Sequence, residues 1–457
     1  MNWLRRNGLR VVLLVLAALA AFPWMDYLPI GAWVPETEKA ILPRLSPLLN
    51  LFGALAAREW VGWSLLLGVP LLVLSFFKGR YFCWRMCPLG FVAELTGKLN
   101  PWGKGLLRRV PSINKAMALL IVVSAAFGYP LAIWLDPLCI FNGFFAAWRL
   151  PLAWASGATA VGFVSILLLS LIAPNIWCHR LCPLGGLQEA IMSWAKRFHG
   201  PKGGKKQDAP KVLSGVVSRR TLLAAVPVAV ASGIVKKAVG ANAAGGIRPP
   251  GADLTRFNAL CARCGNCMTA CTYKLIHPDF GETGVDGLFS PVIHLRSTCG
   301  DPDMDSYCFH DCVKCSQVCP TGALKPLTVL QKHATPIGVA VIDRTKCIAW
   351  KSSELPKGDA GRSDCAVCDE YCPYKAVRIE IRNGVSCPVI VEDKCRGCGA
   401  CEAGCAADPI AVRIRPLRAD EYGKKLLPSE IDSPEKALRG EYENDAAAET
   451  SVVEEAK

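Results

Sequence analysis

The sequence predicts an α-helical transmembrane domain of four to five helices, followed by an α+β ferredoxin-like polycluster domain. Three observations lead to this fold class. The 457 residues are 52% hydrophobic and only 20% charged, which is more apolar than an ordinary soluble enzyme. Four apolar stretches in the first half have about the 20 residues that a transmembrane helix needs. Eighteen of the 23 cysteines follow Leu260, in closely spaced runs that suit metal binding better than disulfides.

The apolar stretches predict where the chain would cross a membrane and in which direction. They cover residues 9–25, 61–77, 116–135 and 153–174. The net charge is +14, and basic residues concentrate before the first stretch and after the second and fourth. By the positive-inside rule these segments face the cytoplasm, so we expect a multi-pass protein of the bacterial inner membrane. The charge then marks membrane orientation, and we expect no nucleic-acid partner.

The basic loops after the second and fourth stretches begin with one repeated motif. It reads Cys83-Trp-Arg-Met-Cys87-Pro-Leu-Gly in the first copy and Cys178-His-Arg-Leu-Cys182-Pro-Leu-Gly in the second. The repeat indicates a duplicated helix hairpin. If both copies reach one face, they gather four thiolates, the number that one iron–sulfur cluster needs. These four cysteines are candidate cofactor ligands for a further metal centre; the alternative is a dithiol or a structural pair without metal. Cys139 lies at the opposite end of the third stretch and is not expected to join them.

The composition changes between the two halves. Residues 1–198 form the expected transmembrane domain, 199–245 a linker, 246–417 the ferredoxin domain and 418–457 an acidic tail that we expect to be disordered.

The linker contains a pattern similar to a twin-arginine export signal. Arg219 and Arg220 precede a mildly apolar run, and an Ala-x-Ala site ends at Ala243. Export would place the ferredoxin domain in the periplasm. The alternatives are a short fifth helix anchored by the two arginines, or a cytoplasmic amphipathic segment.

The cysteines of the second half form four groups of four: Cys261, Cys264, Cys267 and Cys271; Cys308, Cys312, Cys315 and Cys319; Cys347, Cys365, Cys368 and Cys372; and Cys395, Cys398, Cys401 and Cys405. In two-cluster ferredoxins, three cysteines of a group ligate one cluster and the fourth ligates its neighbour. This crossing rule predicts four [4Fe–4S] clusters. Their ligands would be Cys261, Cys264, Cys267 and Cys319; Cys308, Cys312, Cys315 and Cys271; Cys395, Cys398, Cys401 and Cys372; and Cys347, Cys365, Cys368 and Cys405.

Two questions stay open in this assignment. Structural zinc competes for any single Cys-x-x-Cys pair, but zinc takes two such pairs with a longer spacer rather than triplets with a trailing cysteine. Cys299 and Cys387 are left over, and the stretched second group leaves Cys299 as an alternative to Cys308. Alternating apolar segments predict the short strands that flank clusters, at 339–342, 377–381, 389–391 and 411–414.

These motifs resemble two known families. The duplicated Cys-x-x-x-Cys-Pro-Leu-Gly hairpin resembles the NapH-type membrane polyferredoxins. The twin-arginine segment with four cysteine groups, of which the third is split between Cys347 and Cys365, is similar to the NapG/MauM-type periplasmic ferredoxins. The chain thus looks like a fusion of the two. Thr272 and Ala406 depart from the pattern, because a proline often follows the fourth cysteine of a group.

The resemblance implies an electron-transfer role. Electrons would come from the membrane quinone pool, with quinol as donor, and go to a periplasmic cytochrome or terminal reductase. The residues agree, because a series of clusters without a constellation of acid, base or nucleophile conducts electrons and does little other chemistry. We therefore expect an electron-transfer subunit of a quinol dehydrogenase-type complex, not a stand-alone enzyme. The alternatives are an assembly factor for a partner enzyme, or a ferredoxin domain that receives electrons from a soluble cytoplasmic donor.

Overall fold

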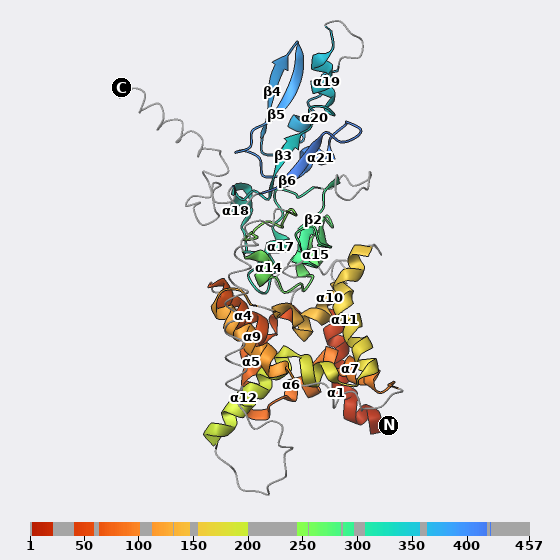
Figure 1. The fold of residues 1–457 in the computed structure, drawn as a ribbon, viewed down its shortest axis with the longest axis vertical. Coiled ribbons are helices and arrows are strands. Elements are labelled where there is room, and N and C mark those ends of the chain that lie inside the picture. Colours follow the sequence, from red (N-terminus) through yellow and green to blue (C-terminus); the bar gives the residue numbers. More distant parts are fainter. Residues whose placement is uncertain are drawn as a thin grey trace, which may run out of the picture.

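The computed structural model describes residues 2–21, 41–58, 64–100, 112–130, 132–146, 154–199, 245–254, 256–284, 287–296, 307–356, 363–417 and 421. The molecule is elongated (Figure 1). A helical part, residues 2–199, occupies one end. A cysteine-rich part, residues 245–417, stacks on it and ends in the hairpin of β4 (Val377–Arg382) and β5 (Val385–Ile390). The predicted export signal at Arg219 and Arg220 and the predicted cleavage site at Ala243 lie outside the described residues. So does the predicted acidic tail, 418–457, except for Glu421.

The helical part is built from helices of very different lengths. In chain order they are α1 (Asn2–Ala21), α3 (Ile41–Arg44), α4 (Pro47–Ala57), α5 (Ser64–Lys78), α6 (Tyr81–Arg85), α7 (Pro88–Gly97), α9 (Asn114–Ala126), η3 (Ile133–Leu135), α10 (Pro137–Ala146), α11 (Trp154–Ile172), η4 (Trp177–Leu181) and α12 (Pro183–His199). Four of them, α4, α7, α10 and α12, begin with proline, whose fixed φ and missing N–H suit the first helical position. Leu89, Leu138, Phe141 and Leu184 are buried together at their contacts.

The prediction of a transmembrane domain is wrong. Among the helices that the structure describes, none combines the length and the apolar composition needed to cross a membrane. The predicted spans 61–77 and 116–135 correspond to α5 and α9, of 15 and 13 residues. At 1.5 Å per residue, both fall short of the roughly 30 Å of a hydrocarbon core. α1 has 20 residues but carries three arginines in its first half. The predicted multi-pass location in the bacterial inner membrane is overturned by the same finding.

The cysteine-rich part mixes short helices with short strands. Its elements are α14 (Phe257–Leu260), α15 (Asn266–Ala270), β1 (Ile276–Pro278), β2 (Pro291–Ile293), α17 (Lys314–Gln317), α18 (Val329–Ala334), β3 (Gly338–Ile342), α19 (Ile348–Glu354), α20 (Val367–Glu370), β4, β5, α21 (Ala400–Ala403) and β6 (Val412–Pro416). Strands lie at all four segments predicted from alternation.

The strands form three two-stranded antiparallel sheets: β1 with β2, β3 with β6, and β4 with β5. β3 and β6 pair in the register Ala340 to Ile414, although more than 70 residues separate them. All the cysteines from Cys347 to Cys405 lie between these two strands in the sequence. The sheet therefore closes the loop that carries the last two cysteine groups.

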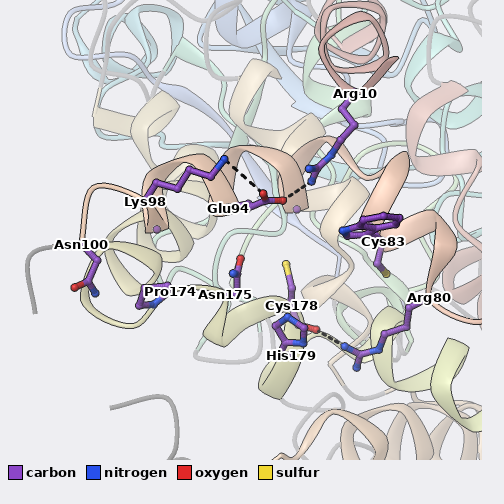
Figure 2. A pocket seen from close by; sticks show the side chains of 13 residues that line it. Arg10, Arg80, Cys83, Glu94, Lys98, Asn100, Pro174, Asn175, Cys178 and His179 are labelled. Carbon is purple, nitrogen blue, oxygen red and sulfur yellow. Dashed lines mark hydrogen bonds and ion pairs between the residues drawn. The ribbon is translucent and has the colours of Figure 1, made fainter. Parts of the chain in front are cut away.

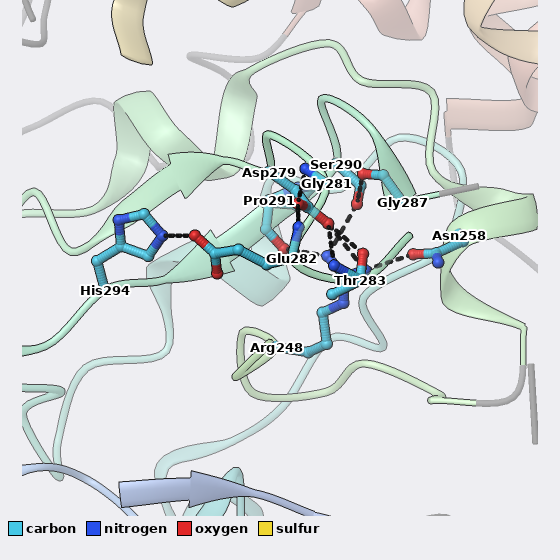
Figure 3. Close-up of polar contacts among 10 residues, drawn as sticks. All are labelled: Arg248, Asn258, Asp279, Gly281, Glu282, Thr283, Gly287, Ser290, Pro291 and His294. Atoms are coloured by element: carbon cyan, nitrogen blue, oxygen red, sulfur yellow. Dashed lines mark hydrogen bonds and ion pairs between the residues drawn. The ribbon is translucent and has the colours of Figure 1, made fainter. Parts of the chain in front are cut away.

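A buried arginine organises the beginning of the cysteine-rich part (Figure 3). Arg248 donates hydrogen bonds of 2.7–2.9 Å to Asn258 Oδ1, Thr283 Oγ1, Ser290 Oγ and the Pro291 carbonyl. The fully buried Asp279 lies 3.9 Å from its guanidinium. Asp279 in turn accepts hydrogen bonds from the backbone amides of Gly281 and Glu282, both at 2.7 Å. The network ties α14, which leads into Cys261, to the loop between β1 and β2.

The helical part packs directly on the cysteine-rich part through α3 and α4. Arg44 donates a 2.8 Å hydrogen bond to the carbonyl of Gln317. The Arg256 guanidinium donates to the carbonyl of Ala56, near the end of α4. A Cβ at Gly53 would lie 3.3 Å from the Cα of Thr321, so this glycine permits the close approach. The helices thus support the loops that carry the first cysteines.

Candidate functional site

The first quartet of predicted ligands, Cys261, Cys264, Cys267 and Cys319, surrounds one cavity, which all four thiols line. Their sulfur atoms lie close enough for each to act on the others. Burial raises the pKa of Cys267 well above its ordinary value, and the charges of Cys264, Cys261 and Cys319 raise it further. Burial also raises the pKa of Cys261 to about 12. A bound cation would favour the thiolate form of such buried thiols, which is the form that ligates metal.

The second quartet, Cys271, Cys308, Cys312 and Cys315, contains a buried cation. Burial raises the pKa of Cys308, whereas the charge and hydrogen bond of Lys332 lower it. Lys332 is only 4% exposed and donates hydrogen bonds to the carbonyls of Phe309 and Cys312, the latter at 2.7 Å. A capping box at Thr328 begins the helix α18 that carries this lysine. A fixed positive charge beside thiolates stabilises extra negative charge on whatever they hold.

The third and fourth quartets follow the same crossed pattern. In the third, burial raises the pKa of Cys398 to about 12, and Cys372 and Cys395 contribute to the rise. In the fourth, burial raises the pKa of Cys368 to about 12, with Cys347, Cys365 and Cys405 contributing. Each quartet therefore combines three cysteines of one group with the last cysteine of another.

The four quartets are arranged in a line, and each is in electrostatic contact with the next. Cys315 of the second quartet raises the pKa of Cys267 in the first. The second and third meet where the Cys308 amide donates a 2.9 Å hydrogen bond to the Cys398 carbonyl. Cys368 of the fourth raises the pKa of Cys401 in the third. The four quartets thus run in sequence from the helical part toward the β4–β5 hairpin.

Backbone amides are directed at several of these sulfurs. The amides of Leu275, Leu324, Ala340 and Ala376 lie 3.2–3.4 Å from the sulfurs of Cys271, Cys319, Cys395 and Cys372, respectively. Hydrogen bonds to the sulfurs are among the means by which a protein sets the potential of an iron–sulfur cluster.

In the helical part, the structure brings the two copies of the repeated motif together. Burial raises the pKa of Cys83 well above its ordinary value, and the charges of Cys182, Cys87 and Cys178 add to the effect. Cys87 caps the N-terminus of α7, where its sulfur accepts a 3.4 Å hydrogen bond from the Gly90 amide. We call Cys83, Cys87, Cys178 and Cys182 the four-cysteine site.

A glutamate four positions after the glycine of each motif copy pairs with an arginine from another part of the chain. Glu94 pairs with Arg10 at 2.6 Å, and Glu189 pairs with Arg80 at 3.0 Å. Arg80 also donates a 3.2 Å hydrogen bond to the Cys178 carbonyl, and its charge lowers the pKa of three of the four cysteines. Cationic residues beside the thiols favour an anionic cofactor.

A pocket of about 700 Å³ opens beside the four-cysteine site (Figure 2). Cys83 and Cys178 line it together with Trp84 and His179. The pocket is also lined by the charged side chains of Arg10, Arg80, Lys98 and Glu94. Burial and the charge of Arg80 lower the pKa of His179, which favours the neutral imidazole. The volume is in the range of a small-molecule site, and it gives a ligand access to two of the four thiols.

A single zinc ion is the competing metal for these cysteines. Within the described ranges, no three His, Cys, Asp or Glu side chains converge closely enough to share one ion. Every cysteine that the structure describes is a free thiol. A zinc ion at about 2.3 Å from each sulfur would draw the thiols to within about 4 Å of one another.

The remaining cysteines have different surroundings. Cys387 is fully buried and donates its S–H to the Ala349 carbonyl at 3.7 Å. It packs in one apolar cluster with Cys347, Cys365 and Cys405 of the fourth quartet. Cys299, the alternative to Cys308, lies outside the described residues. Cys139 is separate from the four-cysteine site, as expected, but its thiol hydrogen-bonds to the sulfur of Cys264.

Comparisons with known proteins bear on both parts. The family described as "4Fe-4S binding domain" matches residues 60–110 and 156–202, which contain the four-cysteine site. The methylamine utilization ferredoxin-type protein MauM of Methylophilus methylotrophus is 32% identical over 188 residues, 38% of this chain and 73% of that protein. MauM of Methylorubrum extorquens is 31% identical over 40% of this chain and 78% of that protein. The ferredoxin-type protein NapG of Escherichia coli is 28% identical over 48% of this chain and 87% of that protein. No solved structure matches the chain.

Proposed function

Because the chain belongs to the family of ferredoxin-type proteins that includes MauM, we propose that its cysteine quartets conduct electrons one at a time along the molecule. The chain is an iron–sulfur protein of ferredoxin type. The proposal adds the number, the ligands and the order of the centres. The observation that carries it is the linear series of crossed cysteine quartets, each in electrostatic contact with the next.

We assign one [4Fe–4S] cluster to each quartet of the cysteine-rich part. The residues suit this group for two reasons: each quartet brings together four cysteines, the number of ligands that one cluster takes, and backbone amides already face several of the sulfurs. A bound cluster supplies a one-electron couple. The protein determines its potential through Lys332, through the amide hydrogen bonds and through burial.

We assign a fifth centre to the four-cysteine site. The match of the "4Fe-4S binding domain" family to both motif copies supports it. The three other thiols of the site also raise the pKa of Cys83, so all four lie close together. Arg80 is placed to offset the negative charge of such a centre. On this view the helical part is the counterpart of NapH-type polyferredoxins, fused ahead of a MauM-type ferredoxin.

The pocket beside Cys83 and Cys178 is the proposed donor site. A quinol fits it, because Trp84 offers an aromatic face and basic side chains favour the phenolate that forms as the quinol loses protons. A cluster held by Cys83, Cys87, Cys178 and Cys182 would accept the two electrons of a quinol one at a time. The two protons of the quinol would pass to water in the open pocket. A cytochrome or a terminal reductase would accept the electrons at the far end, near the fourth quartet.

Reduction kinetics test this function in the full chain. A short-chain quinol should reduce the clusters of the unaltered protein. The double variant Cys83→Ser/Cys178→Ser should lose that reaction while dithionite still reduces the clusters of the cysteine-rich part. Equal reduction of both proteins by quinol would place the donor elsewhere. If the fifth centre is absent and the thiols of the four-cysteine site cycle to disulfides, the assembly-factor alternative replaces this one.

A further inference from the structure

Three helix N-termini converge beside the four-cysteine site. α7, α10 and α12 begin with proline directly after Cys87, Asp136 and Cys182, respectively. The sequences at these starts are Cys-Pro-Leu-Gly, Asp-Pro-Leu-Cys and Cys-Pro-Leu-Gly, so α10 begins with a variant of the repeated motif. Leu138, in the first turn of α10, packs in one buried apolar cluster with Cys87, Cys182, Leu89 and Leu184. The first turn of α10 is therefore a near neighbour of this site.

The same turn contacts the first quartet on its other side. The Cys139 thiol lies in hydrogen-bond contact with the sulfur of Cys264, and both side chains are buried. One turn further along, Asn142 donates 2.7 Å hydrogen bonds to the Cys264 carbonyl and to Asn266 Oδ1. Cys139 and Cys264 belong to one buried apolar cluster with Ala262 and residues of the helical part.

The turn is held rigidly between the two sites. Asp136 is fully buried and accepts hydrogen bonds from the amides of Leu138 at 2.9 Å and Cys139 at 3.2 Å, as the N-cap of α10. The Ser46 hydroxyl donates to its other carboxylate oxygen. A covalent path of four residues thus runs from the neighbourhood of Cys87 and Cys182 to a thiol that touches a ligand of the first quartet.

We propose that the first turn of α10, Asp136–Cys139, is the electron bridge between the four-cysteine centre and the first quartet's centre. The proposal rests on the function proposed above, because it requires both centres to be present. In the step, one electron leaves the reduced four-cysteine centre, which is oxidised, and enters the oxidised first centre, which is reduced. The turn keeps all its bonds, and the Cys139 proton stays on sulfur.

Cys139 has a defined part in this bridge. Its S–H donates to a cluster ligand, and such a bond stabilises the more negative, reduced form of the centre. Removing the donor should make the first centre harder to reduce. A serine keeps a donor at the position and an alanine does not, so the two variants separate hydrogen bonding from packing.

The experiment is an EPR-monitored redox titration of the anaerobic full chain. Cys139→Ala should shift the midpoint potential of one centre downward, and Cys139→Ser should stay closer to the unaltered protein. The centre that shifts should be the one lost in Cys264→Ser. Cys387→Ala removes another fully buried thiol, which lies beside the fourth quartet; it is the matched control and should leave the first centre unchanged. In the unaltered protein, the spectrum of that centre should also show magnetic coupling to the four-cysteine centre, lost in Cys83→Ser/Cys178→Ser.

Three results would overturn the bridge while all five centres are present: an unchanged first centre in Cys139→Ala, an equal shift in Cys387→Ala, or no magnetic coupling between the two centres. Iron missing from the four-cysteine site in the unaltered protein would instead refute the fifth centre of the proposed function. The spectra of the remaining centres report that each variant has folded.

Discussion

Replacing Arg248 by alanine should loosen the segment that leads into the first quartet. The side chain is buried and donates to four acceptors (Figure 3). The substitution also leaves the fully buried Asp279 without the positive charge of Arg248 beside it. Removing one partner of a buried ion pair costs about 3–5 kcal/mol. Because a factor of ten corresponds to about 1.4 kcal/mol, the opening equilibrium of this segment should rise by roughly two to three and a half powers of ten.

Hydrogen exchange measured by mass spectrometry reports this opening directly, in peptides that cover β1 and β2. Arg378→Ala is the matched control. Arg378 is also ion-paired, with Glu380 at 2.8 Å, but is 67% exposed. An exposed pair contributes about 1 kcal/mol or less, so exchange near β4 should change by less than roughly a factor of six. A similarly small change in hydrogen exchange in both variants would refute the reasoning. It would show that burial does not determine how much free energy is lost when the arginine is removed.

Three further predictions concern the cysteines and their surroundings. Lys332→Met removes the cation that lowers the pKa of Cys308, so the midpoint potential of the second centre alone should fall in a redox titration; a shift of every centre would contradict the assignment. Cys398→Ser should cost about four iron atoms per chain, whereas Cys387→Ser should cost none by metal analysis. Burial lowers the pKa of His277 from 6.5 to about 4. As the pH is lowered, the unfolded chain therefore binds this proton before the folded chain does. The urea concentration at the unfolding midpoint should decrease as the pH is lowered from about 6.5 to about 4. His277→Gln should flatten that dependence, and an unchanged slope would reject it.

The grouping of the cysteines could be predicted from sequence because their spacing is local. Three thiols within seven residues, such as Cys261, Cys264 and Cys267, must lie on one loop, and the trailing Cys271 must point away from them. The structure brings together the crossed quartets that this rule gives. Lys332 could not be found in this way, since it reaches Cys312 across 20 residues and nothing in the intervening sequence predicts the contact.

The helical part shows the opposite limit. The apolar stretches located α5, α9 and α11, but hydropathy does not show where a helix ends. α9 ends at Ala126, whereas the predicted span continued to residue 135. The chain then turns through Gly128, at a φ of +86°, and forms η3 and α10 instead. The position of α10 between two cysteine sites depends on tertiary packing, so Cys139 could be separated from the repeated motif but not connected to Cys264.

Iron and acid-labile sulfide, measured per chain in the anaerobically isolated full-length protein, test the central claim most directly. Five [4Fe–4S] centres require about twenty of each, and the variant Cys83→Ser/Cys178→Ser should retain about sixteen. Bound zinc in place of iron, or no more than about eight iron atoms per chain, would contradict the account of a linear series of centres on five cysteine quartets.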